Sequence, residues 1–275
     1  MPRVILKELL REFFRMKQRK CCLLFMTHTW NAGIATALAA LEEAIGKRFD
    51  IHVLVDVTSN PSVPDLDRSH LYRFTADQVT PPDYKVKAAH HPGTIWPMNI
   101  ELPVLWFFKK HQKYQYYWVM EYDVRFTGDW RVFFDAFEDN ASELLATTLY
   151  RHRFRPDWQH WRTLTAPMPV PEHERVRGLF PLYRLSNTAL ARLESAYLTG
   201  WGGHYEVTIP TILTKAGMRI EDFGGDGEFV PAGNHNRFYR NTPINAGLAP
   251  GTFTVAPNQT DPAAPPEMLW HPIKR

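Results

Sequence analysis

Residues 21–57, CCLLFMTHTWNAGIATALAALEEAIGKRFDIHVLVDV, carry the pattern that decides the fold. Two apolar runs, Cys21–Thr27 and Asp50–Val57, have the length and composition of buried strands. Between them, Ala32–Gly46 repeats its apolar residues at helical spacing. A strand, a helix and a second strand in this order indicate a βαβ unit, so we expect an α/β fold with a parallel sheet covered by helices.

The rest of the chain continues this alternation. Strands are predicted at Leu71–Phe74, Tyr116–Met120, Glu143–Tyr150 and Leu179–Arg184, and helices at Met98–His111, Trp130–Phe137, Asn187–Leu198 (capped by Ser186) and Val207–Ala216. Pro103 is expected to kink the first of these helices or to mark an early turn. Ser59–Pro82 and Arg151–Arg177 are predicted loops with four prolines each. Loops as long as the second are often functional.

Composition limits the classes of protein to which the chain can belong. With 275 residues, 44% of them apolar, it can bury a sizeable core, which excludes a disordered chain. The formal net charge of +3 is too small for a general polyanion-binding surface, so nucleic acid is not expected as a partner. The 9 Trp, 11 Tyr and 17 Phe residues are numerous, and some of these rings are expected at the surface.

Cysteine usage and apolar runs bear on location. Cys21 and Cys22 are adjacent and cannot easily form a disulfide with each other, so a reducing, cytoplasmic setting is expected. No transmembrane span is expected after Lys20, because polar residues interrupt the apolar run beyond Met26.

The chain is divided into three parts. Residues 4–18 predict a basic amphipathic helix, which either lies peripherally on the inner surface of a membrane or docks on the chain's own domain. This N-terminal helix (1–20) precedes a main domain (21–240) and a proline-rich tail (241–275), which is expected to wrap on the domain.

The stretch most informative about chemistry is Trp118–Trp130, WVMEYDVRFTGDW. An apolar strand there ends at Glu121 and Asp123, which share one face of an extended chain because they are two residues apart. Ligand sites collect at the carboxyl ends of strands in open α/β sheets, and carboxylate oxygens suit Mg²⁺ or Mn²⁺. A turn in which Asp123 pairs with Arg125 explains the same residues.

The pattern E-x-D-V-R-x-T-G after an aromatic-rich strand resembles the signature of a group of uncharacterised proteins regarded as glycosyltransferases. More broadly, it is similar to the D-x-D region of nucleotide-sugar-dependent glycosyltransferases with the GT-A fold. The close likeness covers Tyr116–Tyr150. It implies a GT-A-like (Rossmann-like), mixed, mostly parallel sheet flanked by helices over 21–240, and a Mn²⁺ or Mg²⁺ ion on the donor diphosphate. Glu121 departs from the usual first aspartate, so Asp123 is the firmer metal ligand, while Glu121 is expected at the metal or the nucleotide.

The resemblance also implies a late histidine that completes the metal site. His271 in LWHPIKR is assigned this role, and Lys274 is expected near the phosphates of the nucleotide. His235 in GNHNR is the competing candidate. A solvated tail histidine explains His271 as well.

An inverting transfer needs a base for the acceptor hydroxyl. The stretch GWGGHYEVT (200–208) resembles the loop that precedes the base in GT-A enzymes, so Glu206 is the candidate. Asp226 and Asp222, in the loop IEDFGGDGEF, are the alternatives. A first-turn acid stabilised by the helix dipole also explains Glu206.

The nucleotide and the acceptor need further contacts. In GT-A enzymes the loop after the first strand commonly holds the base, which implies nucleotide binding by Thr27, Thr29, Trp30 and Asn31, although a loop that caps the next helix explains them equally. Asp56 is expected at the ribose or in a turn. Rings in polar loops are expected to contact the acceptor: Trp158, Trp161, Trp201 and Tyr205.

These expectations combine into a metal-dependent glycosyltransferase that moves a sugar from a nucleotide-diphosphate sugar to a hydroxyl of a glycan or glycolipid. A non-catalytic carbohydrate-binding protein is one alternative, since exposed rings serve it as well. A nucleotidyltransferase or phosphohydrolase with the same carboxylate pair is another.

Overall fold

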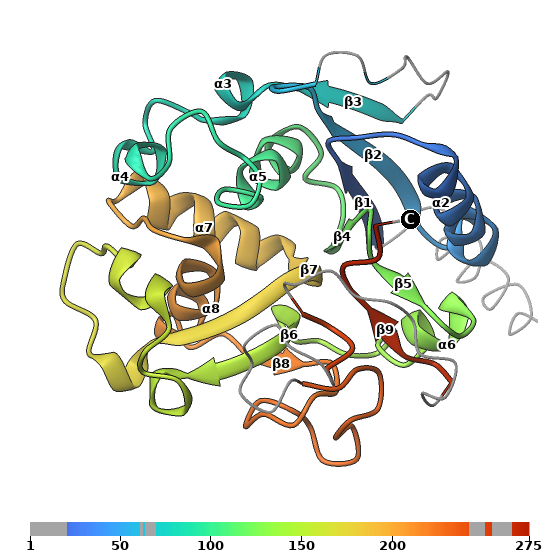
Figure 1. Ribbon diagram of the computed structural model, residues 1–275. Coiled ribbons are helices and arrows are strands. Elements are labelled where there is room, and N and C mark those ends of the chain that lie inside the picture. Colours follow the sequence, from blue (N-terminus) through green and yellow to red (C-terminus); the bar gives the residue numbers. More distant parts are fainter. Residues whose placement is uncertain (1–20, 61–62, 64–69, 242–250, 255–265, 275) are drawn as a thin grey trace, which may run out of the picture.

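A seven-stranded sheet runs through the centre of the molecule (Figure 1). The computed structural model describes residues 21–60, 63, 70–241, 251–254 and 266–274. Across the sheet the order is β3 (Leu71–Phe74), β2 (Asp50–Asp56), β1 (Cys21–Thr27), β4 (Tyr116–Glu121), β7 (Val176–Ser186), β6 (Leu144–Arg151) and β8 (Ile220–Asp222). Strand β7 is antiparallel to β4 and β6, and the other adjacent pairs are parallel. The predicted mixed, mostly parallel sheet flanked by helices is therefore confirmed.

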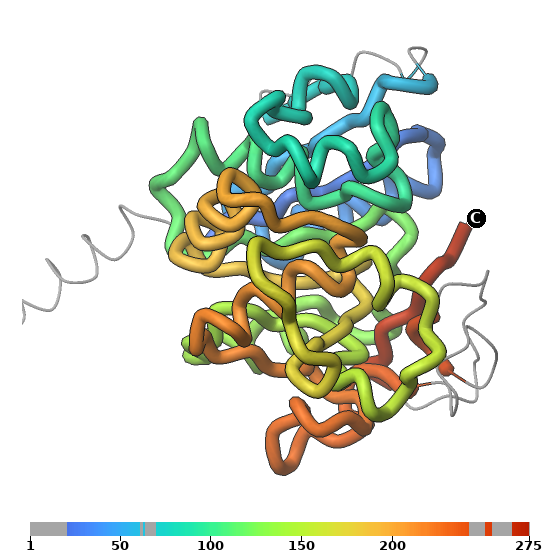
Figure 2. The backbone as a smooth tube through the Cα atoms, turned by 90° about the vertical axis from the view of Figure 1, so that its left-hand side faces the viewer, coloured from blue at the N-terminus to red at the C-terminus, as the bar shows by residue number. Residues whose placement is uncertain are grey.

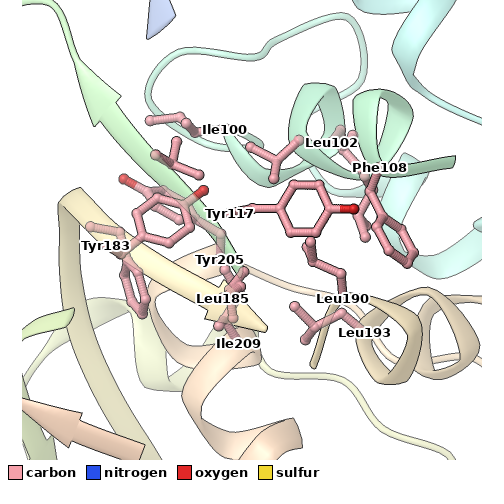
Figure 3. Close-up of a cluster of buried hydrophobic side chains, with 14 of the residues drawn as sticks. Ile100, Leu102, Phe108, Tyr117, Tyr183, Leu185, Leu190, Leu193, Tyr205 and Ile209 are labelled. Carbon is pink, nitrogen blue, oxygen red and sulfur yellow. The ribbon is translucent and has the colours of Figure 1, made fainter. Parts of the chain in front are cut away.

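Helices cover both faces of this sheet. On one face, α5 (Glu101–Lys110), α7 (Asn187–Leu198) and α8 (Tyr205–Lys215) pack around Tyr117 and Leu185 in a first core cluster (Figure 3). The short helices α3 (Ala76–Val79) and α4 (Lys85–Ala89) lie near this side (Figure 1). On the other face, α2 (Ala32–Ile45) and α6 (Trp130–Asp135) pack around Trp118 in a second core cluster. The strands between them are buried on both faces, which is why their sequences are almost wholly apolar.

Capping side chains fix where helices begin. Asn31 accepts the N–H of Ile34 at 2.9 Å, and Ser186 accepts that of Ala189 at 3.0 Å, as predicted for the second of these caps. Helix α5 begins at Glu101 rather than at Met98, so Pro103 lies in its first turn, where its missing N–H costs no helical hydrogen bond. Helix α8 begins at Tyr205, two residues before the predicted start.

The polar segments hold more structure than predicted. Ser59–Pro82, predicted as a loop with one short strand, also contains α3. The loop after β6 contains three short 3₁₀ turns, η1 (His152–Phe154), η2 (Gln159–Thr163) and η3 (Glu172–Glu174). This loop lies against the start of α8 (Figure 2), and Thr165 and Gly202 exchange backbone hydrogen bonds of 2.9 and 3.0 Å there. Strands β5 (Arg125–Phe126) and β9 (Leu269–Trp270), which pair antiparallel, were too short to leave a pattern.

Parts of the two chain ends are described only in pieces. The amphipathic helix expected at 4–18 lies outside the described residues, as do 242–250 and 255–265 of the tail. The described tail residues Phe253 and Leu269 pack into the second core cluster. Within the described part of the chain, no helix is both long enough and apolar enough to cross a bilayer.

Candidate metal and substrate site

The carboxyl end of β4 places two carboxylates at a tight turn. Glu121 is the last residue of β4, and its carbonyl accepts the N–H of Val124 at 3.1 Å, which closes a turn around Asp123. Arg125 donates to the carbonyls of Tyr122 and Val124, at 2.7 and 2.8 Å. Among the described residues it forms no ion pair with Asp123, whose ion-pair contact is to a histidine instead. Backbone contacts therefore hold the turn, and Asp123 is left for another partner.

The C-terminal segment supplies that histidine. Strand β9 pairs with β5, directly after the turn, so the next residue along the chain, His271, comes beside the carboxylates. The N–H of Ile273 donates to the carbonyl of Asp123 at 2.9 Å and holds the segment in place. The competing candidate, His235, is exposed and does not reach them.

Glu121, Asp123 and His271 form a compact, buried cluster. Each offers a ligand atom, and these atoms lie within 4.8 Å of one another. Nε2 of His271 lies 3.4 Å from Oδ1 of Asp123 and 3.6 Å from Oε2 of Glu121. On the other side of the ring, Nδ1 donates to the carbonyl of Thr254 at 2.7 Å, because a carbonyl can only accept. Proteins commonly orient a metal-binding histidine by such a hydrogen bond.

The ionisation of this cluster follows from burial and mutual attraction. Burial lowers the pKa of His271, but its contacts with Asp123 and Glu121 outweigh burial and raise that pKa to about 9. Burial raises the pKa of Glu121. At Asp123 burial acts in the same direction, but the close contact with the charged ring of His271 outweighs it and lowers the pKa. A protonated ring therefore balances the carboxylates of the metal-free cluster at neutral pH.

The residues of the cluster fit a divalent cation. Oδ1 of Asp123 is buried and has no hydrogen-bond partner among the described residues, which is costly for a carboxylate oxygen. The separation of 3.4 Å from His271 is an electrostatic contact rather than a well-formed hydrogen bond. Two carboxylates and one imidazole are ligands that Mn²⁺ accepts, and Mg²⁺ favours the carboxylates. A cation would take over the role of the ring proton.

The cluster lies in the wall of a cavity of about 820 Å³. The predicted site residues that line this main cavity are Glu121, Asp123, Tyr205, Glu206, Trp158, His271 and Lys274. A side cavity of about 320 Å³ adjoins it, because His28 and Trp96 line both. Asp56 lines the side cavity, where its Oδ1 accepts the N–H of Thr58 at 2.8 Å. Both volumes are typical of small-molecule pockets.

Glu206 is a buried acid in the first turn of α8. His204 caps this helix, since its Nδ1 accepts the N–H of Glu206 at 3.3 Å. Burial lowers the pKa of His204 to about 2, so the ring is neutral and its 3.8 Å contact with the Glu206 carboxylate is not an ion pair. Burial raises the pKa of Glu206 to about 7, against the opposing charge of Arg177. A carboxyl group with this pKa in a cavity wall is suited to accept a proton from a hydroxyl.

The loop after β1 uses its own polar groups. Thr27 donates to the carbonyl of Thr29, Asn31 caps α2, and Trp30 packs against the second core cluster. None of these four lines either of the two cavities. Their described contacts match the structural alternative, a loop that caps the following helix.

Four other candidates also lie outside the main cavity. Asp226 accepts a hydrogen bond from Tyr150, and Asp222 is buried and accepts from Tyr239 at 2.7 Å. Trp161 is 2% exposed and donates to the carbonyl of Arg155 at 2.7 Å, while Trp201 packs against the first core cluster. Trp161 and Trp158 meet in a T-shaped arrangement, with ring centroids 5.0 Å apart, so Trp161 supports a ring that does line the cavity.

Sequence reasoning missed several cavity-lining residues, among them His28, Trp96 and Arg177. His28 lies inside the loop that was singled out, but nothing in THTWNAG distinguishes it from its neighbours. Arg177 was assigned to the end of a loop, although it lies in β7. The only signal in the sequence that pointed to Arg177 was the arginine-rich and tryptophan-rich composition of the predicted loop at 151–177.

One family model and several solved structures are similar to parts of this chain. The model of a family described as Protein of unknown function (DUF3405) matches residues 39–149, which include Glu121 and Asp123. No curated protein matches in sequence. The structure of a proposed glucose-1-phosphate thymidylyltransferase from Bacillus anthracis has a TM-score of 0.42 at 11% identity, over 74% of this chain and 86% of that one.

Two glycosyltransferase structures are similar at a comparable level. The mannosyltransferase Ktr4p from S. cerevisiae has a TM-score of 0.37 at 12% identity, over 75% of this chain and 69% of that one. A glycosyltransferase involved in glycosylation of the major capsid of PBCV-1 has a TM-score of 0.30 at 9% identity, over 62% of each chain. At such distances the function has to be inferred from this chain's own residues.

Proposed function

We propose that this protein is a cation-dependent glycosyltransferase, which moves a sugar from a nucleotide-diphosphate sugar to a hydroxyl of a glycan or glycolipid. The observation that supports it is the convergence of Glu121, Asp123 and His271 in the wall of the main cavity, beside a smaller second cavity. A donor of this kind has a nucleoside, a diphosphate and a sugar, and a main cavity with an acidic cluster in its wall and a second cavity beside it suit these parts.

The donor side is assigned to the cluster and the side cavity. Glu121, Asp123 and His271 would hold Mn²⁺ or Mg²⁺, which when bound neutralises charge on the departing nucleoside diphosphate. Lys274 lines the same cavity from an exposed position and adds a positive charge there. Asp56 in the side cavity offers carboxylate oxygens to ribose hydroxyls.

The acceptor side is assigned to Glu206 and the rings near it. Glu206 takes the proton from the attacking hydroxyl, which its raised pKa allows near neutral pH. Trp158 and Tyr205 line the same cavity, and the half-buried Trp158 presents ring surface on which a sugar can stack.

Calorimetric titration of the full chain with UDP and GDP, with and without Mn²⁺, tests the donor site. We expect one nucleotide to bind in the presence of Mn²⁺ and to bind at least about tenfold more weakly after Asp123→Ala, because a cation ligand is lost. The matched control is Asp139→Ala, which removes an exposed carboxylate that does not line the main cavity. Equal affinity in the wild type and Asp123→Ala would refute the proposal.

Turnover distinguishes the alternatives. Incubation with a panel of UDP-sugars and GDP-sugars and simple glycosides is expected to release nucleoside diphosphate only when Mn²⁺ or Mg²⁺ is present. Sugar binding that needs neither nucleotide nor cation would favour a carbohydrate-binding protein. Formation of a nucleotide sugar from a nucleoside triphosphate and a sugar phosphate would favour a nucleotidyltransferase.

A further inference from the structure

Arg177 is a buried cation whose hydrogen-bonding groups are not used by the fold. It is 5% exposed, and its Nε and Nη1 have no hydrogen-bond partner among the described residues. It nevertheless contributes to the lining of the main cavity. A guanidinium group has five N–H donors, and leaving them unpaired in a buried place is costly. Such a group points to a ligand that completes it.

Another arginine on the same strand shows what a structural arginine looks like in this protein. Arg184, also in β7, donates to the carbonyl of Phe137 at 3.2 Å, to Asn140 at 2.8 and 3.0 Å, and to the carbonyl of Ser142 at 3.0 Å. Both Nη atoms of Arg184 are therefore paired with the ends of neighbouring segments, and only its Nε has no partner among the described residues. Arg177 has no comparable set of acceptors in the described structure.

The surroundings of Arg177 orient it without neutralising it. Its guanidinium carbon lies 4.5 Å from the centre of the Trp158 ring, a stacking geometry that leaves the N–H edge free. No carboxylate among the described residues forms an ion pair with it, since the nearby Glu206 acts on it only at longer range. Burial lowers the pKa of Arg177 to about 10, so it stays charged at neutral pH.

The sheet places Arg177 on the side of the cavity away from the side cavity. Met120 of β4 pairs with Leu182 of β7, and Arg177 lies five residues before Leu182, about 16 Å from it at the usual rise per residue and beyond the carboxyl end of the antiparallel β4. In the sheet order the side cavity lies at the end of β2, the acidic cluster at β4, and Arg177 on β7. Arg177 is thus separated from the assigned nucleoside position by the cation cluster.

We infer that Arg177, stacked on Trp158, forms an oxyanion subsite that binds a carboxylate or phosphate group on the acceptor saccharide. That the saccharide is an acceptor rests on the proposed function. The subsite itself is defined by the main cavity and by the unpaired N–H groups of Arg177. A planar guanidinium edge can donate two parallel hydrogen bonds to such an oxyanion. Trp158 can meanwhile support the sugar ring that carries it.

Ligand binding to the full chain in EDTA tests the subsite without the cation. The probes are methyl glucuronide and glucose 6-phosphate, with methyl glucoside as the neutral match. We expect at least one anionic probe to bind about tenfold or more tightly than the glucoside, and Arg177→Met to abolish this preference. Arg192→Met, at an exposed position on α7, is the control and should retain it. The anionic probe that binds more tightly shows whether the subsite prefers a carboxylate or a phosphate ester.

A second measurement does not depend on whether a variant folds. In the wild type, the Nε–H resonance of Arg177 should shift when the preferred anionic probe is added, while that of Arg184 stays in place. Equal binding of charged and neutral probes, a preference that survives Arg177→Met in a folded variant, or an unmoved Arg177 resonance would each overturn the subsite. Separate titration of UDP and GDP with Mn²⁺ tests the proposed function. If neither nucleotide binds but the anionic probe does, the oxyanion subsite stands and the proposed function fails. If a nucleotide binds but the anionic probe shows no preference, the proposed function stands and the subsite fails.

Discussion

Replacing Glu206 by glutamine should make the protein more stable at neutral pH. The carboxyl group is buried in the wall of the main cavity, and burial raises its pKa from 4.5 to about 7. The folded protein therefore keeps a proton that the unfolded chain releases. Glutamine has nearly the same shape and no charge to desolvate, so it removes this cost while it also removes the proposed base.

The sign and size of the effect follow from linkage between protonation and folding. Below pH 4 both states of the wild type are protonated, and the carboxyl group contributes nothing. Between about pH 4.5 and 7 the unfolded chain loses the proton first, so the free energy of unfolding falls as pH rises. Above pH 7 the loss levels off at about 3 kcal/mol, from about 1.4 kcal/mol for each pKa unit.

Urea unfolding in EDTA at pH 4 and pH 8 measures this. The stability gained by Glu206→Gln relative to wild type should be about 3 kcal/mol larger at pH 8 than at pH 4. Glu138→Gln, at an exposed position, is the control and should change little between the two pH values. A pH-independent difference for Glu206→Gln would refute the buried acid with a raised pKa. In turnover assays the variant should lose transfer, and the wild-type rate should rise through pH 7.

Three further changes test other parts of the structure. Lys87→Met should lower the free energy of unfolding by about 3–5 kcal/mol, because it leaves Glu101 buried without its ion-pair partner. Adding Glu101→Gln to the same chain should restore part of that loss in urea unfolding. If the double variant is no more stable than Lys87→Met, the ion pair is not the cause. His271→Ala should weaken Mn²⁺ binding by about tenfold or more in a calorimetric titration, and unchanged affinity would remove it from the cation site. Gly203→Ala should lower the free energy of unfolding by about 2 kcal/mol or more, since φ is +118° and a Cβ would meet a backbone oxygen. Gly217→Ala, at φ +71° with open space around it, should lower it less. Equal urea midpoints for the two variants would contradict the packing argument.

The central strands could be predicted because their burial on both faces leaves a local pattern. Cys21–Thr27 and Tyr116–Met120 are apolar runs of strand length between polar segments, and the structure has strands at both. Strands β5 and β9 could not be predicted, since each has two residues and exists only through pairing with a distant partner. Their pairing is what brings His271 to the carboxylates.

The candidate site was predictable where an acid follows a buried strand, and less so elsewhere. Glu121 and Asp123 stand out because of the abrupt polarity change after YYWVM. In the loop after β1, the sequence could not separate Asn31, which the fold consumes as a cap, from His28, which faces both cavities. Arg177 acquires its setting from Trp158, whose position depends on how a long loop packs against α8.

The carboxylate–histidine cluster joins the turn after β4 to a chain segment far away in sequence. Residues 266–274 are held there by the β5–β9 pair, by the Ile273–Asp123 hydrogen bond and by the charges around His271. A cation that bound all three side chains would add its affinity to the docking of this segment. Cation binding and the resistance of residues 266–274 to proteolysis would then be coupled. Chelation of the cation would loosen this segment, and cleavage within it would release the cation.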